Sequence, residues 1–317
     1  MRTIGKDTRG AVYVEFLLVF IPVFMIFLGT VQASLMFAAN LVVNHSATTA
    51  ARAAAVVVDD EEKHYNNDAR LTIEDGDKGE SVMDKVGSLL EWAGMSSSGG
   101  SSGGGGGSSG GSGNAREGAI RSAASLPLIA VSPSMEQLIS DPSVYRAIGG
   151  SAGDRALTGA AIYNRTAVAV TFPSSIGGTD NLQEFGANDD IHVRVTYLFN
   201  CAVPLANRVM CDDIVSLKTG VPLEAIQHMA SAIGHGASPG EIMRMVERVQ
   251  AGRDRIRRAR PGIAELDHAE SPNLAYLTAL TGARFSVMRA EATMPNHGAS
   301  YSYADDSSDS GSGGGGE

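Results

Sequence analysis

The feature that most limits what this chain can fold into is an uninterrupted apolar run near its N-terminus. From Phe16 to Val43 the sequence contains no Asp, Glu, Lys or Arg. A helix rises 1.5 Å per residue, so about 20 residues cross the ~30 Å hydrocarbon core of a bilayer, and this run is longer than that. Arg2, Lys6 and Arg9 precede it, which predicts a cytoplasmic N-terminus with the rest of the chain outside. We therefore expect a single-pass membrane protein.

The apolar run does not resemble a conventional secretory signal, which has an apolar region of about 7–15 residues followed by a small-residue cleavage site. Here the small residues precede the run, and Glu15 stands at its border. An unpaired carboxylate in hydrocarbon costs at least ~2.5 kcal/mol, so Glu15 needs a partner. The alternative leaves Glu15 at headgroup depth, where water or Arg9 satisfies it.

The residues around Glu15 resemble the processing site of class III signal sequences. Those precursors are cut after a Gly by a prepilin peptidase, and the mature chain has Glu at its fifth position. Counted from Ala11, which follows Gly10, Glu15 is the fifth residue. The stretch RGAVYVEF, the apolar run and then NHSATTAARAAA are similar to the TadE-like minor pilins or pseudopilins of the Tad/Flp (type IVb) pilus system. This resemblance covers residues 1 to about 57.

The resemblance implies a function in pilus assembly. It implies a leader at residues 1–10, cleavage between Gly10 and Ala11, and a Glu15 carboxylate that meets the freed α-amino group of its own or a neighbouring subunit. The implied partners are a prepilin peptidase, other pilin-like subunits, the inner-membrane assembly platform and membrane lipid. The implied location is the bacterial inner membrane, with the C-terminal domain in the periplasm or on the extracellular pilus.

The sequence beyond the apolar run predicts an α+β protein: a long N-terminal transmembrane helix, then a small antiparallel sheet domain with helical insertions and disordered Gly/Ser segments. Alanine-rich text continues the helix from Ala11 to about Val57. The expected divisions are a transmembrane helix at 11–57, a helical extracytoplasmic segment at 58–95, a Gly/Ser linker at 96–113, an α+β domain at 114–303 with a helical insertion at about 222–280, and a disordered acidic tail at 304–317.

Three segments have the alternation of apolar and polar residues that is typical of strands. They are 161–172, 191–199 and 283–293. In the second, Ile191, Val193, Val195 and Tyr197 should share one face. We expect these strands to form a small antiparallel sheet that leans on the N-terminal helix.

The chain has two cysteines, Cys201 and Cys211, both beyond the apolar run. Their spacing suits one short-loop disulfide in an oxidising compartment, contributing roughly 2–3 kcal/mol. Two unrelated buried thiols are the alternative. A metal site fits less well, because no CxxC pattern or nearby pair of histidines supplies further ligands.

The charge and motif content argue against nucleic-acid binding and catalysis. The formal net charge is −10, which opposes binding to phosphate. Five arginines lie between 253 and 260, and acidic residues lie before and among them. This mixture of charges favours a solvated helix face or contact with an acidic partner. His228 and His235 lack a third ligand, and the Asp189–Asp190 and Asp212–Asp213 pairs favour turns or strand ends over calcium. The sequence contains no HExxH motif and no Walker loop, and it therefore predicts no enzyme and no cofactor.

A second hypothesis comes from a different class of protein. The apolar segment could be only an uncleaved signal anchor, holding a periplasmic binding or enzyme module that enters no fibre. This alternative predicts that the part beyond residues ~60 keeps its activity or ligand when the anchor is exchanged.

Overall fold

The computed structural model describes residues 9–73, 115–134, 151–213, 265–269 and 283–296, with single positions at 217, 240, 244 and 247. Its helical elements, with 3-10 turns written η, are α1 (Arg9–Val57), η1 (Glu62–His64), α3 (Ala115–Leu128), η2 (Ile129–Val131), α6 (Ala152–Ala167), α7 (Ala206–Met210) and η3 (Leu266–His268). Its strands are β1 (Val168–Thr171), β2 (Asp190–Asn200), β3 (Asp212–Asp213) and β4 (Arg284–Pro295).

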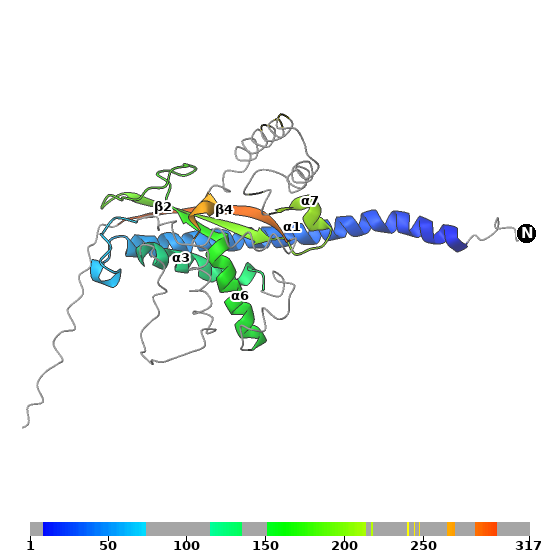
Figure 1. Ribbon diagram of the computed structural model, residues 1–317, viewed down its shortest axis with the longest axis horizontal. Helices are drawn as coiled ribbons and strands as arrows, with labels where there is room; N and C mark the ends of the chain where they lie inside the picture. The colour runs from blue at the N-terminus through cyan, green and yellow to red at the C-terminus, as the bar shows by residue number, and fades with distance from the viewer. Residues whose placement is uncertain are drawn as a thin grey trace, which may run out of the picture.

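Helix α1 dominates the shape of the molecule. It is a single helix of 49 residues that runs unbroken through Pro22. In Figure 1 its N-terminal half projects alone from the body of the protein, and its C-terminal half lies along the sheet. The prediction of one long helix is confirmed, and the helix begins at Arg9, slightly before the expected Ala11.

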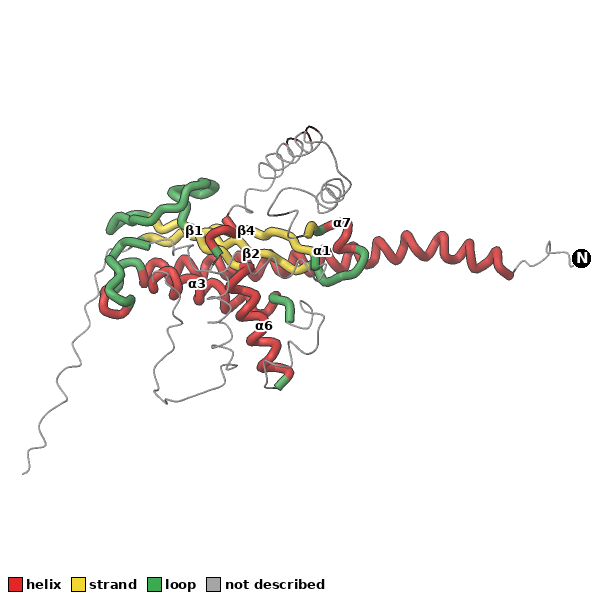
Figure 2. The backbone as a smooth tube through the Cα atoms, viewed as in Figure 1, coloured by secondary structure: helices red, strands yellow, loops and turns green. Residues whose placement is uncertain are grey.

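The four strands form one antiparallel sheet in the order β1-β2-β4-β3. The two central strands, β2 and β4, pair along their whole length, from Asp190 opposite Pro295 to Asn200 opposite Phe285. Figure 2 shows this sheet lying along the covered half of α1. The predicted α+β class and the small antiparallel sheet are therefore confirmed.

One predicted strand is largely wrong. Of the expected strand at 161–172, residues up to Ala167 belong to α6 and only Val168–Thr171 are extended. A capping box between Ser151 and Asp154 starts α6, and the helix then buries Ala160, Tyr163 and Ala167, which recur at helical spacing. The alternation seen in the sequence was compatible with both structures, and the upstream cap decided between them.

The two faces of the sheet have different covers. Ile191, Val193 and Val195 are buried on the face of Tyr197, whose hydroxyl is hydrogen-bonded to Ser132 just after η2, the turn that follows α3. The opposite face presents Arg194 and Thr196, which bond to Glu265 before η3. Helices α1 and α3 therefore pack on one side and the η3 segment on the other.

The core joins α1, α3 and the inner face of the sheet. On α1 the buried residues are mostly alanines, namely Ala39, Ala47, Ala50, Ala51 and Ala54, each without exposed surface. The buried Ser46 hydroxyl donates to the Ala124 carbonyl of α3. Small side chains let the sheet and α3 approach the axis of α1 closely.

Several predicted segments lie outside the described residues. These are the leader up to residue 8, the part of the 58–95 segment after 73, the linker at 96–113, most of the insertion at 222–280, and the tail at 304–317.

Candidate functional site

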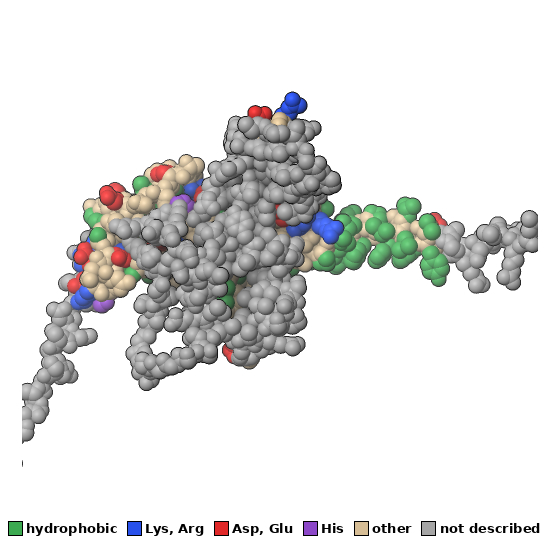
Figure 3. Space-filling view, viewed as in Figure 1, with side chains coloured by type: hydrophobic (Ala, Val, Ile, Leu, Met, Phe, Trp, Pro, Cys, Tyr) green, Lys and Arg blue, Asp and Glu red, His purple; other side chains and the backbone are tan. Residues whose placement is uncertain are grey.

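The N-terminal half of α1 has no cover from the rest of the protein. Its large hydrophobic side chains are exposed on all sides, including Tyr13, Phe16, Leu18, Ile21, Val23, Ile26 and Phe27. Figure 3 shows these apolar side chains standing clear of the body. Within the described part of the chain, α1 is the helix long and apolar enough to cross a membrane, and none of its most apolar stretch is buried.

The predicted processing and assembly residues all belong to the N-terminal half of α1. Gly10 and Ala11 lie in its first turn, and Glu15 is exposed. Residues i and i+4 of a helix share a face, so Ala11 and Glu15 occupy neighbouring positions one turn apart. The structure thus places Glu15 on the uncovered apolar surface, four positions after the residue that the resemblance makes the mature N-terminus.

The C-terminus of α1 is held by an arginine from α3. A helix leaves its last carbonyls without intrahelical donors and carries partial negative charge there, and α1 has no basic residue in its last turn. Arg116, which has no exposed surface, donates to the carbonyls of Val57 and Val58 and to those of Asp60 and Asp68 at 2.9 and 3.1 Å.

The same Arg116 guanidinium lies 4.7 Å from the centre of the Tyr65 ring. A cation over an aromatic face is attracted by the ring, and more strongly when both are out of water. Arg116 therefore binds the end of α1 to α3 and to the segment that follows α1, which fixes the covered half of the helix.

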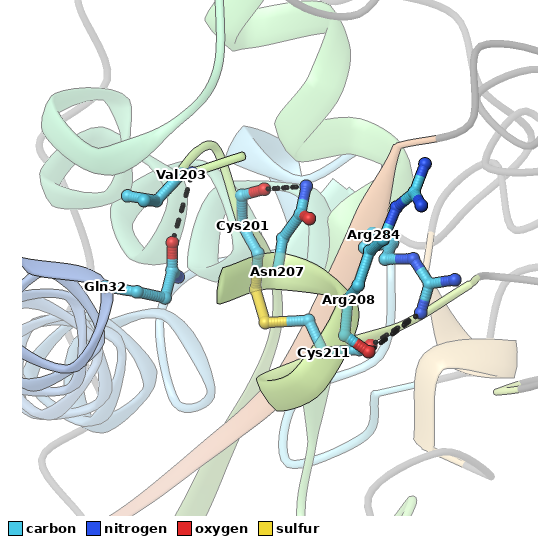
Figure 4. Close-up of a disulfide and its surroundings, with 7 residues drawn as sticks. All are labelled: Gln32, Cys201, Val203, Asn207, Arg208, Cys211 and Arg284. Carbon is cyan, nitrogen blue, oxygen red and sulfur yellow. Dashed lines mark hydrogen bonds between the residues drawn. A yellow bond between two sulfur atoms is a disulfide. The ribbon is translucent and has the colours of Figure 1, made fainter. Parts of the chain in front are cut away.

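The disulfide loop, residues 201–211, lies where α1 emerges from the body. Cys201 and Cys211 are joined in a disulfide, and both are buried. The Asn207 amide donates to the Cys201 carbonyl at 3.3 Å, and Arg284 donates to the Cys211 carbonyl at 3.2 Å. Figure 4 shows these contacts, with α7 closing the loop.

Gln32 fixes this loop at one level of α1. The Gln32 side chain is fully buried, and its Oε1 accepts a hydrogen bond from the Val203 N–H at 3.2 Å. Gln32 is the residue nearest the N-terminus of α1 that the described part of the body covers completely. The boundary between the bare and covered halves of α1 is therefore at Gln32.

The loop turns outward at a strained residue. Leu205 has φ 68° and ψ −51°, and the Ala206 N–H donates to the Pro204 carbonyl across it at 2.8 Å. This is a γ-turn of the positive-φ form, which is rare and strained for a residue with a side chain. Leu205, Val209 and Met210 are 46%, 78% and 39% exposed, so the strained turn and α7 together present an apolar tip.

A charged cluster locks the outer face of the sheet. Arg194 has 1% of its side chain exposed and bonds to Glu265 and Glu291, each at 2.9 Å. Arg289 adds a 2.7 Å contact to Glu291. Two arginines and two carboxylates compensate one another here, as buried charges require.

The pKa of Glu291 reflects the cluster. Burial opposes ionisation of Glu291, but the Gly177 N–H, Arg289 and Arg194 all donate hydrogen bonds to its carboxylate. These bonds outweigh the burial and hold the pKa of Glu291 below its ordinary value. The cluster joins β2, β4 and the residues before η3, and it is a structural lock.

Two buried tyrosines connect α6 to the sheet. The Tyr163 hydroxyl donates to the Leu198 carbonyl, and its ring meets that of Tyr197 edge-on with centroids 6.3 Å apart. Burial raises the pKa of both hydroxyls well above the ordinary value. Both therefore remain protonated donors at any physiological pH.

The remaining polar candidates from the sequence have structural positions. Asp189 accepts a hydrogen bond from the Gly186 N–H in a turn, Asp190 begins β2, and Asp212–Asp213 form β3. Among the residues with described placement, no group of three or more His, Cys, Asp or Glu is arranged to hold a metal ion. His228, His235 and the arginines between 253 and 260 lie outside the described residues.

Comparison with known proteins gives a match within helix α1. A protein-family model described as TadE-like protein matches residues 10–52. The N-terminal helix resembles the TadE-like family. The matched segment starts at Gly10, includes Glu15 and extends across Gln32 into the covered half of α1. Searches of curated proteins and of solved structures found no match to the chain.

The TadE-like segment includes the bare half of α1 and most of the half under the sheet. The body itself, from α3 to β4, lies outside the match. Sequence reasoning predicted the disulfide between Cys201 and Cys211, which the structure contains, and Gly10, Ala11 and Glu15 stay predictions. It missed Gln32, Arg116 and Leu205. Gln32 and Arg116 bond to residues that are far away in the sequence, and Leu205 matters through its backbone conformation. No local sequence pattern predicts either kind of feature.

Proposed function

We propose that this chain is a minor pilin or pseudopilin that takes part in assembling a Tad/Flp-type adhesive pilus, after a prepilin peptidase cuts it between Gly10 and Ala11. The observation that carries the proposal is the bare, apolar half of the TadE-like helix with Glu15 on its surface. TadE-like proteins are a structural family associated with pili, so the proposed role is one of assembly and not of catalysis.

Cleavage before Ala11 gives Glu15 a partner. It creates an α-amino group at Ala11, one helical turn before the Glu15 carboxylate. An ammonium of the same chain or of a neighbouring subunit then compensates the carboxylate, which otherwise is costly in an apolar environment. Pairing between neighbours also fixes the axial offset between their helices.

The bare half of α1 suits two environments in succession. Before assembly, lipid covers its large apolar side chains, and the chain crosses the inner membrane once with its N-terminus in the cytoplasm. During assembly, the helices of other pilin-like subunits replace lipid against the same surface. The sheet body, held to the second half of α1, stays outside in both states.

The first test changes the cleavage site. Gly10→Ile places a bulky side chain where the peptidase requires a glycine, and we expect the chain to keep residues 1–10. Gly5→Ile puts the same side chain elsewhere in the leader and should leave processing intact. Intact mass of the membrane-extracted protein distinguishes the forms, and equal processing of both variants would contradict the proposed cleavage.

The second test removes the charge that the freed amine would meet. Glu15→Gln should be processed normally but should reduce the amount of pili at the cell surface. Glu247→Gln, at an exposed position of the body, is the matched control and should assemble like the unaltered chain. Normal piliation by Glu15→Gln would show that the carboxylate is dispensable.

The signal-anchored module makes the opposite prediction for a helix exchange. Replacing residues 11–31 by an unrelated apolar helix should preserve the function of a tethered module. In a pilin-type subunit it should abolish assembly, while the outer body still folds with its disulfide. The state of the disulfide therefore separates a loss of assembly from a loss of folding.

A further inference from the structure

The apolar tip of the disulfide loop lies beside the exposed apolar surface of α1. Leu205, Val209 and Met210 form the tip, and α7 packs against α1. We propose that this tip enters the headgroup–acyl boundary of the outer surface of the membrane that α1 crosses, so that the protein holds the bilayer at two points. The inference rests on the membrane crossing in the proposed function.

The level of the loop along α1 agrees with the outer edge of the bilayer. Glu15 is the last charged residue before the apolar run, so the hydrocarbon begins at about Phe16. About 20 residues cover its ~30 Å thickness, which places the outer end at about Leu35. The hydrogen bond from Val203 holds the loop at Gln32, which is roughly 5 Å inside that end.

Interfacial elements bury their apolar side chains about 5–10 Å below the headgroups. The tip begins two residues after Val203, and α7 packs against α1, so α1 cannot cross the bilayer in the proposed register without bringing Val203 and the neighbouring tip to the interface. Lipid is therefore adjacent to the tip whenever α1 is inserted.

The backbone of the loop holds the apolar tip outward. Leu205 is the centre of a strained γ-turn, yet 46% of its surface is exposed, so packing within the described body does not account for an apolar side chain there. The disulfide and the Arg284 contact to the Cys211 carbonyl fix the loop that carries it. An apolar environment outside the body would bury the exposed side chain of Leu205 and so explain why an apolar residue stands at a strained position.

The charge beside the tip fits a lipid headgroup. Arg208 is exposed on α7, next to Val209, and Figure 3 shows basic side chains where the apolar part of α1 leaves the body. An arginine next to an inserted apolar residue can extend its guanidinium to the phosphates while its stem remains in the apolar layer. The tip thus combines the two kinds of side chain found on interfacial helices.

A protein partner fits the tip less well. Three side chains, one at the γ-turn and two on the five-residue helix α7, offer far less surface than the roughly 800 Å² that each side of a stable protein interface buries. A bilayer needs no such area, because α1 already anchors the chain and the second contact adds no translational cost. Two points of contact would set the tilt of the sheet body against the membrane.

The experiment measures the depth of single tryptophans in full-length protein reconstituted in lipid nanodiscs. Trp92→Phe removes the one tryptophan of the chain. Single reporters then follow: Val209→Trp at the tip, Phe27→Trp in the middle of the bare helix, and Ile176→Trp as the matched control. Ile176 is 74% exposed and lies in the β1–β2 connection at the opposite end of the sheet.

Quenching by brominated acyl chains gives the result. We expect strong quenching for Phe27→Trp, clear quenching with a blue-shifted emission for Val209→Trp, and neither effect for Ile176→Trp. If Val209→Trp behaves like Ile176→Trp while Phe27→Trp is quenched, α1 crosses the membrane and the tip does not touch it, which overturns the inference alone.

Two other outcomes overturn the inference for different reasons. Absence of quenching at Phe27→Trp would remove the membrane crossing itself, and with it the proposed function. A blue shift of Val209→Trp that rises with protein concentration and resists the lipid quencher would show that a second copy of the chain covers the tip.

Discussion

The two halves of α1 have the same backbone and opposite surroundings. Before Gln32 the helix exposes Phe, Leu, Ile and Val on all sides. After Gln32, one side consists of buried Ala, Val and Ser, and the outward side exposes Leu35, Phe37 and Leu41 before it changes to Asn44, His45, Thr48 and Arg52. Large side chains all round suit lipid or exchangeable helix neighbours, whereas alanines suit one permanent, close neighbour. The size of the side chains on the helix surface therefore distinguishes the half that packs against the body from the half that does not.

The largest effect should come from the residue that ends the covered half. Arg116→Met leaves four buried or part-buried backbone carbonyls without their donor. We expect the free energy of unfolding of the body to fall by about 3 kcal/mol or more. Urea unfolding in detergent, followed by near-UV circular dichroism, measures it. Arg52→Met, at an exposed position of the same helix half, should change little, and equal losses would contradict the capping role.

The disulfide at the boundary between the halves should have the next largest effect. Replacing Cys201 and Cys211 by Ser opens a loop with a sequence separation of 10. The loop-entropy model gives a loss of roughly 2–3 kcal/mol. Reductant should lower the unfolding midpoint of the unaltered chain by a similar amount and leave the double variant unchanged. An effect of reductant on the double variant would attribute the loss to something else.

A matched pair of alanines, one buried and one exposed, tests whether the sheet and α3 pack closely on one side of α1. Ala50 has no exposed surface, and Ala38 is exposed on the same helix. Ala50→Leu should cost about 1–3 kcal/mol by overpacking, and Ala38→Leu should stay within about 0.5 kcal/mol. Unfolding of both variants in the same detergent gives the difference. Similar costs would mean that the sheet does not pack on α1 as described.

The smallest expected effect is on the loss of stability at acid pH. The folded-state pKa of Glu291 is lowered, so this carboxylate stabilises the fold above its unfolded pKa of about 4.3, and the contribution disappears as pH falls through the folded value. Glu291→Gln should therefore flatten the loss of stability below about pH 4. Glu184→Gln changes an exposed acid in the β1–β2 connection and should lose stability below about pH 4 as the unaltered chain does, when unfolding is measured as a function of pH. The same loss in Glu291→Gln would show that other groups govern the acid sensitivity of the fold.

The sequence predicts the long helix, the two central strands and the α+β class because each rests on a local pattern. The apolar run and the alanines fix α1, and the period of two from Ile191 to Tyr197 fixes β2. The strand expected at 161–172 was mostly wrong because alternation over Tyr163 and Ala167 also satisfies a helix, and its cap lies at Ser151.

The contacts that join distant parts could not be read from local patterns. Arg116 caps a helix that ends 59 positions earlier, and Gln32 bonds to a loop 171 positions later. Nothing in the sequence around either residue indicates those partners. Leu205 is a further case, because the sequence does not reveal that a leucine adopts a positive φ.

The central claim is that α1 is the assembly helix of a processed pilin-type subunit. Intact mass and N-terminal sequencing of the protein recovered from its native membrane test it most directly. The account predicts a chain that starts at Ala11, with Glu15 at its fifth position. A chain that starts at Met1 and is otherwise folded in the membrane would contradict the claim and leave residues 1–45 as a plain signal anchor.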